Sequence, residues 1–422
     1  MRRLPYVVTF LVPLQSVLAA FGLRYAVYAL LAGGTAVFLL RAAVRGRAAG
    51  GFRPVWIFVA YVGALVVLQP GIVAAYGFLT YAQFALFWLS YVYAYGEVDT
   101  ALLTRVNLAV ATVVAVVGLY QYLLDPTLSG FSTYGGVEVY LTAGRELRIN
   151  SLLPSAMTLG AYMVVSVLLA LTLPARTAFV KTAVALCLIC AFLTGNKSTL
   201  FCLGAAGLYW LVERSERRHG LLRPMAALGA VVLLYLVILS AAGSWAPWLA
   251  RVSPTVYRAV APFFFTGDIG EVAYLLAYWA MLFTFYGGSG LAALAFGNGL
   301  GLTRQNTTFF GGEVLGDFIV AEGFLVQLLF EIGIVGLVLF HVVLWRVFRA
   351  ARERRVPGRA GFDHVLAALY ANMIVVHVFS GVFLGFLWGY FASLLSARPV
   401  ESPAGHEPVA GLKDPVPASD AV

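Results

Sequence analysis

A lysine stands between two apolar runs in the middle of the chain, in the segment Leu193-Thr194-Gly195-Asn196-Lys197-Ser198-Thr199. A cation at a membrane boundary costs free energy unless its side chain reaches water or meets an anion. Both explanations are open for Lys197. The side of the membrane that it faces, and the residues in the neighbouring loops, decide between them.

Five arginines could act together with Lys197, because the distribution of Lys and Arg predicts that their segments lie with Lys197 on the outer side of the membrane. They are Arg145, Arg148, Arg251, Arg258 and Arg304. A cluster of guanidinium and ammonium groups suits a phosphate or a pyrophosphate. The alternative is that each cation pairs with a lipid headgroup or with a nearby carboxylate. The carboxylates available are Asp125, Glu138, Glu146, Asp268, Glu271, Glu313 and Asp317.

The composition places these residues in a membrane protein. Of the 422 residues, 61% are hydrophobic and 11% are charged, and the mean hydropathy is +0.89. A soluble domain carries about 25% charged residues. The three cysteines (Cys187, Cys190 and Cys202) lie inside apolar runs, which predicts packing residues rather than disulfides or metal ligands.

Apolar runs of sufficient length to cross a bilayer recur along the chain, and they predict an all-α, polytopic protein with about 12 transmembrane helices. The first run follows Arg2-Arg3 and is predicted to be a retained helix rather than a cleaved signal peptide. The predicted spans are 5–22, 25–41, 54–69, 72–95, 105–124, 151–173, 178–194, 198–213, 224–246, 320–346, 362–380 and 381–397.

The distribution of Lys and Arg predicts the orientation. With the N-terminus inside, 21 of the 28 cations fall on the inner side and 7 on the outer side. This asymmetry predicts that both termini are cytoplasmic. The net charge of +9 is then a topology signal and not a nucleic-acid-binding one.

Two predicted outer loops, at about 125–150 and 246–319, are too long to be simple turns, and long loops commonly carry function. We expect residues 1–397 to form a single transmembrane domain with a large external, periplasmic loop. Residues 398–422 are rich in Pro, Ala, Glu and Asp, which predicts a disordered cytoplasmic tail.

Three segments resemble one family, the O-antigen ligase and O-antigen polymerase superfamily, over about Arg148 to Phe340. The first is Arg148-Ile149-Asn150-Ser151-Leu152-Leu153-Pro154-Ser155-Ala156, similar to that family's arginine-led entry to a span. The second is Leu193–Leu200, which is similar to the family's Leu-Thr-x-Ser-Arg reversal between two spans. Asn196 stands where the family has the serine, and Lys197 stands where it has the arginine. The third is Phe296-Gly297-Asn298-Gly299-Leu300-Gly301 with the helix Ala321–Leu337, similar to the end of its external loop.

The resemblance implies a glycosyltransferase of the GT-C type, without metal or other cofactor, that uses a polyprenyl-pyrophosphate-linked glycan as donor. Arg148 and Lys197 would then hold the pyrophosphate, assisted by Arg251, Arg258 and Arg304, with Arg145 a secondary candidate. Fixed cations in a water-poor site stabilise a departing pyrophosphate as its negative charge grows. A lysine in place of the family's arginine loses bidentate contact.

The chain departs from the ligase pattern at one position. Ligases of the family place a histidine before the exit helix, whereas Glu322 stands there in this chain, and all five histidines lie in predicted spans or on the inner side. This favours a polymerase or a related exopolysaccharide enzyme, with Glu322 as the general base. Alternatively, Glu322 is a helix-start carboxylate at the positive end of a helix dipole. His377 is a secondary candidate, and a packed histidine is the alternative.

Two further features of the third segment have structural interpretations. Gly297, Gly299 and Gly301 lack the strand and acidic partner of a nucleotide loop and predict a turn with close backbone approach. Glu331 is predicted to be structural and bonded to another helix, although a carboxylate inside a membrane is also a functional hypothesis.

The leading hypothesis is therefore an O-antigen or exopolysaccharide polymerase that moves glycan onto the sugar hydroxyl of a lipid-linked repeat unit. Its partners would be polyprenyl-pyrophosphate oligosaccharide, membrane lipids and a chain-length regulator, without nucleic acid. The alternatives are a ligase with another acceptor and a lipid-linked oligosaccharide flippase. Nearly charge-free spans and cations clustered on one face disfavour the flippase.

The topology predicts where introduced cysteines react. We expect cysteines at Ser132 and Ser253 to be labelled by an impermeant thiol reagent on intact spheroplasts, whereas one at Ser215 is labelled only after lysis, because that loop is predicted to be cytoplasmic. The reverse pattern would place Lys197 and its neighbouring arginines in the cytoplasm and would remove the pyrophosphate hypothesis.

Overall fold

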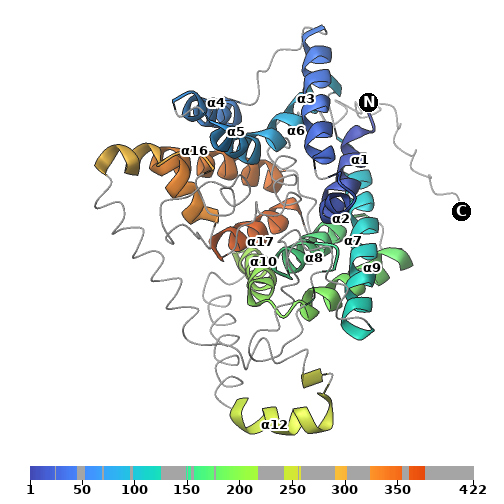
Figure 1. The fold of residues 1–422 in the computed structure, drawn as a ribbon. Helices are drawn as coiled ribbons and strands as arrows, with labels where there is room; N and C mark the ends of the chain where they lie inside the picture. Colours follow the sequence, from blue (N-terminus) through green and yellow to red (C-terminus); the bar gives the residue numbers. More distant parts are fainter. Residues whose placement is uncertain are drawn as a thin grey trace, which may run out of the picture.

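The computed structural model describes residues 1–23, 25–44, 53–68, 71–95, 98–124, 149, 151–153, 156–174, 177–216, 242–254, 256–257, 290–301, 324–353 and 361–375. Every regular element within these residues is helical, so the predicted all-α class is confirmed for them. Figure 1 shows the helices packed around a common centre, with α12 at the lower end of the view.

The N-terminal part follows the predicted runs, with two interruptions. The predicted span 5–22 divides at Pro13, because proline cannot complete the helical hydrogen-bond pattern. The predicted span 72–95 contains a π-helical turn. The elements are α1 (Leu4–Leu11), η1 (Val12–Leu14), α2 (Gln15–Ala20), α3 (Ala26–Val44), α4 (Arg53–Leu68), α5 (Ile72–Phe78), η2 (Leu79–Gln83) and α6 (Phe84–Tyr95).

The middle part is an up-and-down group of four helices, α7 (Thr100–Leu123), α8 (Ala156–Leu171), α9 (Ala178–Leu193) and α10 (Lys197–Glu216). The Asp99 carboxylate caps α7 by accepting from the Leu102 amide at 2.9 Å, and Thr177 caps α9. Between α7 and α8, the Asn107 Nδ2 donates to Ser166 Oγ at 3.0 Å, a buried polar contact of the kind that joins helices in an apolar surrounding.

The C-terminal part contains α12 (Ala242–Val252), a helical segment 290–296, α16 (Phe324–Glu353) and α17 (Phe362–Val375). Within the described residues, α12 covers the end of the predicted span 224–246 and the start of the predicted loop 246–319. Of the predicted loop 125–150, only Ile149 is described, and the predicted span 381–397 and tail 398–422 lie outside the described residues.

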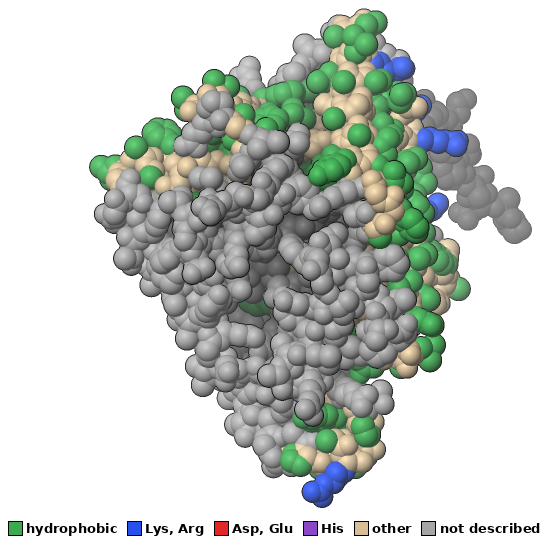
Figure 2. Space-filling model, in the orientation of Figure 1, with side chains coloured by type: hydrophobic (Ala, Val, Ile, Leu, Met, Phe, Trp, Pro, Cys, Tyr) green, Lys and Arg blue, Asp and Glu red, His purple; other side chains and the backbone are tan. Residues whose placement is uncertain are grey.

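Within the described residues, α3, α7 and α16 are long and apolar enough to cross a membrane, and five shorter helices are also apolar. Many large apolar side chains on them are exposed, among them Leu40, Val67 and Leu124. Figure 2 shows apolar side chains gathered over the described helices, with Lys and Arg at few points. Such a surface is typical of contact with lipid. The count of about 12 spans remains a prediction.

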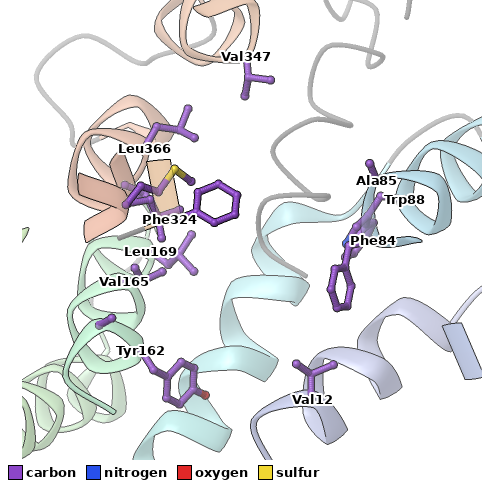
Figure 3. Close-up of a cluster of buried hydrophobic side chains, with 14 of the residues drawn as sticks. Val12, Phe84, Ala85, Trp88, Tyr162, Val165, Leu169, Phe324, Val347 and Leu366 are labelled. Carbon is purple, nitrogen blue, oxygen red and sulfur yellow. The ribbon is translucent and has the colours of Figure 1, made fainter. Parts of the chain in front are cut away.

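The core is aromatic at the contact between α3 and α6. The Phe38 ring lies 5.6 Å from the Phe87 ring and 5.3 Å from the Tyr91 ring, and Trp88 is fully buried beside them. Figure 3 shows the more central part of the cluster, where Phe324 of α16 lies with Leu169 of α8 and Leu366 of α17. Cys187, Cys190 and Cys202 are buried, in agreement with packing roles.

A buried polar cluster joins the end of α10 to the start of α17. The Tyr209 hydroxyl donates to Asp363 Oδ2 at 2.9 Å, and His364 Nδ1 lies 3.2 Å from Asp363 Oδ1. His364 Nε2 faces Glu213 Oε2 at 3.8 Å. These groups lie on the predicted inner side, toward the end of α10 opposite to Lys197.

Candidate functional site

The first two motif segments lie together at one end of the α7–α10 group. In the entry segment before α8, the Ser151 amide donates to Gln121 Oε1 at 2.8 Å and the Ser151 hydroxyl donates to the Val114 carbonyl at 2.6 Å. Ser151 has a positive φ of 51°, an uncommon conformation for a residue with a side chain. The C-terminal half of α7 therefore fixes the residues that follow Arg148.

The second motif is the predicted reversal between α9 and α10. Gly195 adopts φ 60°, and its amide donates to the Phe192 carbonyl at 3.1 Å, which ends α9 in the manner typical of a glycine C-cap. Asn196 and Thr199 are buried, and the Thr199 amide donates to the Asn196 carbonyl at 3.0 Å. Lys197 is the first residue of α10.

The two segments meet where α8 and α10 begin. A side chain added at Gly160, in the second turn of α8, would collide with the Thr199 hydroxyl in the first turn of α10, so the two helix starts are in close contact. A Cβ at Gly118 of α7 would lie 2.9 Å from Cys190 of α9 and 3.3 Å from Ile149. Because α8 and α10 enter from the same end, their partially positive N-termini converge beside Lys197 and Ile149.

The third motif forms a separate site, built on a break in α16. Gly333 interrupts the helix with φ 64° and ψ −173°, a conformation open to glycine almost alone. The Phe324 and Phe340 rings lie 5.6 Å apart, although 16 residues of straight helix would separate them by about 24 Å. The chain therefore folds back at Gly333, and residues 324–332 pack against the segment that follows.

The glycine-rich segment satisfies the carbonyl groups that this break releases. The Asn298 amide donates to the Phe330 carbonyl at 2.9 Å, and the Gly299 amide donates to the Glu331 carbonyl at 3.3 Å. Side chains at Gly297 and Gly333 would collide with the backbone of Glu331 and Ala295, respectively. The predicted close backbone approach is confirmed, and its cause is the capping of a helix end inside the protein.

Glu331 occupies the centre of this junction, fully buried. Its Oε2 accepts from the Tyr81 hydroxyl at 2.8 Å and from the Gly301 amide at 2.9 Å, and its Oε1 accepts from Gln327 Nε2 at 3.3 Å. The prediction that Glu331 bonds to another helix is confirmed by Tyr81. The carboxylate connects η2, the glycine-rich segment and α16.

Tyr61 of α4 completes the junction, since its hydroxyl donates to the Ile332 carbonyl at 2.7 Å. Tyr61 lies near the middle of α4 and Tyr81 near the middle of the α5–α6 run, so the junction is at mid-height of these helices. Sequence reasoning did not find Tyr61, Tyr81 or Gln327. Polar groups inside apolar runs are the signal that could have found them.

The other predicted site residues are mostly outside the described part of the chain. Arg251 is exposed in the last turn of α12, and Figure 1 shows α12 apart from the labelled helices α7–α10. Phe324, two residues after Glu322, is fully buried against Tyr81. The residues outside the described part are Arg145, Arg148, Arg258, Arg304, Glu322 and His377.

The break at Gly333 can be tested by adding one methyl group. We expect Gly333→Ala to lower the free energy of unfolding by about 1–3 kcal/mol, because alanine is strained at this φ and its Cβ meets the Ala295 carbonyl. Gly204→Ala is the matched control, because Gly204 lies in a helix with open space around its Cα. Alanine there should raise the free energy of unfolding by up to about 1 kcal/mol. Equal thermal midpoints in detergent for the two variants would contradict the described junction.

Neither a comparison with protein-family models nor a comparison with curated proteins finds a significant match. The candidate site therefore rests on its own residues and contacts.

Proposed function

We propose that the protein is an inner-membrane polysaccharide polymerase of the GT-C type. It transfers a glycan from a polyprenyl pyrophosphate to the sugar hydroxyl of a second lipid-linked repeat unit on the outer face of the membrane. The observation that carries the proposal is the contact between the helix starts of α8 and α10. This contact joins α8, which follows the Arg148 segment in the sequence, to α10, whose first residue is Lys197.

An anionic group is the ligand that suits this end of the helix group. Two helix N-termini contribute partial positive charge, and in our proposal Arg148, eight residues before α8, and Lys197, the first residue of α10, add two full charges. The outer position of these cations opposes the usual bias of Lys and Arg, which favours a role in binding. A pyrophosphate uses both features, and its charge grows as it leaves, so the cations lower the barrier without a metal ion.

The transfer itself needs a group that removes a proton from the acceptor. In our proposal Glu322 takes the proton of the acceptor hydroxyl, and the oxygen bonds to the anomeric carbon of the donor. The bond from that carbon to the pyrophosphate oxygen breaks, and the pyrophosphate departs with the electron pair. Arg258 and Arg304 are further candidates for pyrophosphate contact, with Arg145 and His377 secondary, and Arg251 is the least favoured because of its place on α12.

A flippase for lipid-linked oligosaccharide is the second candidate, because of the break in α16. Helices interrupted in mid-membrane, with a buried carboxylate beside them, are typical of transporter binding sites. In this chain, however, three donors already satisfy the Glu331 carboxylate. This favours a structural junction over a transport site. A ligase with a different acceptor shares the same donor chemistry, and analysis of the product separates it from a polymerase.

The cations should act through charge. We expect Arg148→Ala and Lys197→Ala to abolish polymer in cells at unchanged protein level. Lys197→Arg should retain activity, because it keeps the charge and supplies the planar guanidinium found at this position of the family that the motif resembles. Arg349→Ala is the control, since Arg349 is exposed and, within the described residues, pairs with Glu353, four residues on. Full activity of both alanine variants at Arg148 and Lys197 would exclude the anion-binding role.

Glu322→Gln tests the general base. Glutamine keeps the size and hydrogen-bonding capacity but cannot take the proton, so we expect chain elongation by purified protein on synthetic lipid-linked repeats to fall by about 10²- to 10⁴-fold while donor binding is unchanged. If Glu322 only interacts with a helix dipole, the change costs about 0.3–1 kcal/mol and elongation persists. Glu353→Gln, at an exposed carboxylate, is the matched control.

A further inference from the structure

A cationic pocket lies at the start of the chain, far in sequence from the motifs discussed above. It has a volume of about 550 Å³, and its walls come from α1, the end of α6 and the start of α7. Its walls include Arg2, Arg3, Tyr6, Tyr91, Asp99 and Leu102.

Hydrogen bonds fix the walls of the pocket. The Tyr91 hydroxyl donates to the Arg2 carbonyl at 3.1 Å, and the Asp99 amide donates to the Tyr6 hydroxyl at 3.2 Å. The Asp99 carboxylate is turned to the start of α7, where it accepts from the Leu102 amide. The pocket is thus a built feature, in which α1, α6 and α7 are tied to one another.

The charge of this region is unbalanced. Arg41 lies with its guanidinium 4.7 Å from the centre of the Tyr95 ring, and that ring packs on Tyr91 at 5.0 Å. Arg41 is therefore a third cation of this region, connected to the pocket wall through the Tyr95 and Tyr91 rings. All three arginines are exposed, and within the described residues none of them forms an ion pair. Guanidinium groups beside tyrosine hydroxyls are well suited to the oxygens of a phosphate.

Apolar surface continues from the pocket along the helices. Leu102, on the pocket wall, is 40% exposed, and Val113 and Val116 further along α7 are 55% and 50% exposed. On α1, Val7 and Phe10 are 47% and 49% exposed. A ligand with an anionic head and apolar chains fits the cationic pocket and the apolar surface beside it better than a free phosphate does, because its chains can cover the exposed apolar side chains.

We propose that this pocket binds the phosphate headgroup of an anionic membrane phospholipid, with the acyl chains along α1 and α7. The predicted orientation places it in the cytoplasmic leaflet, where basic residues next to membrane helices recognise such headgroups. The site is distinct from the proposed polymerase site and does not depend on it.

The test is lipid binding by the purified full chain in neutral detergent, measured by titration with phosphatidylglycerol, phosphatidylcholine and inorganic phosphate. We expect phosphatidylglycerol to bind and to raise the thermal midpoint, and the other two to leave it unchanged. The double variant R2Q/R3Q should bind phosphatidylglycerol about 25-fold more weakly, from about a five-fold contribution of each arginine. R349Q removes one exposed charge elsewhere and should bind normally.

A second variant covers the case in which R2Q/R3Q fails to fold. Leu102→Glu puts a carboxylate on the pocket wall within the first turn of α7, where a negative charge favours the helix, so the variant should fold and lose lipid binding. Phosphate binding equal to that of phosphatidylglycerol would identify a soluble-anion site instead. Equal loss in R349Q, or unchanged binding in R2Q/R3Q and Leu102→Glu, would overturn the proposal.

Discussion

The structure of the C-terminal half depends on one constraint: backbone groups away from water must find partners within the protein. When α16 breaks at Gly333, the carbonyls of Phe330, Glu331 and Ile332 lose their helical donors. The amides of Asn298 and Gly299 and the hydroxyl of Tyr61 replace them. The segment 296–301 must therefore approach the helix end at backbone distance, and glycine alone permits this at positions 297 and 333.

Much of the helical framework could be predicted from the sequence. Long apolar runs and the reversal at Gly195 indicate helices within a few residues of those observed for α7 to α10. Hydropathy is continuous across Pro13 and η2 and therefore indicates neither division; at Pro13 the proline itself is the signal of a break, whereas η2 follows from no residue type in its run. The reversal at Gly333 was missed for the same reason: Ile332, Ile334 and Val335 give no polar signal of a turn.

The candidate site was predictable in part. The reversal at Gly195 and the approach of the glycine-rich segment follow from residue types alone, because a positive φ and a missing Cβ are local requirements. The partners of Glu331 could not be predicted, because they depend on which helices are neighbours. Tyr81 lies 250 residues from Glu331 in the sequence, and nothing near either residue indicates the other.

The two carboxylates of the third motif are suited to different tasks. The Glu331 oxygens accept hydrogen bonds from Tyr81, Gly301 and Gln327, and a proton taken up there would remove the negative charge that strengthens these bonds and so weaken the junction that holds the broken helix. A general base must take up and release a proton in every cycle. A carboxylate whose hydrogen bonds hold a helix junction would weaken that junction each time. Glu322 precedes α16 by two residues in the sequence. If the reaction needs a carboxylate from this segment, Glu322 is therefore the better candidate, with Glu331 holding the helix on which it depends.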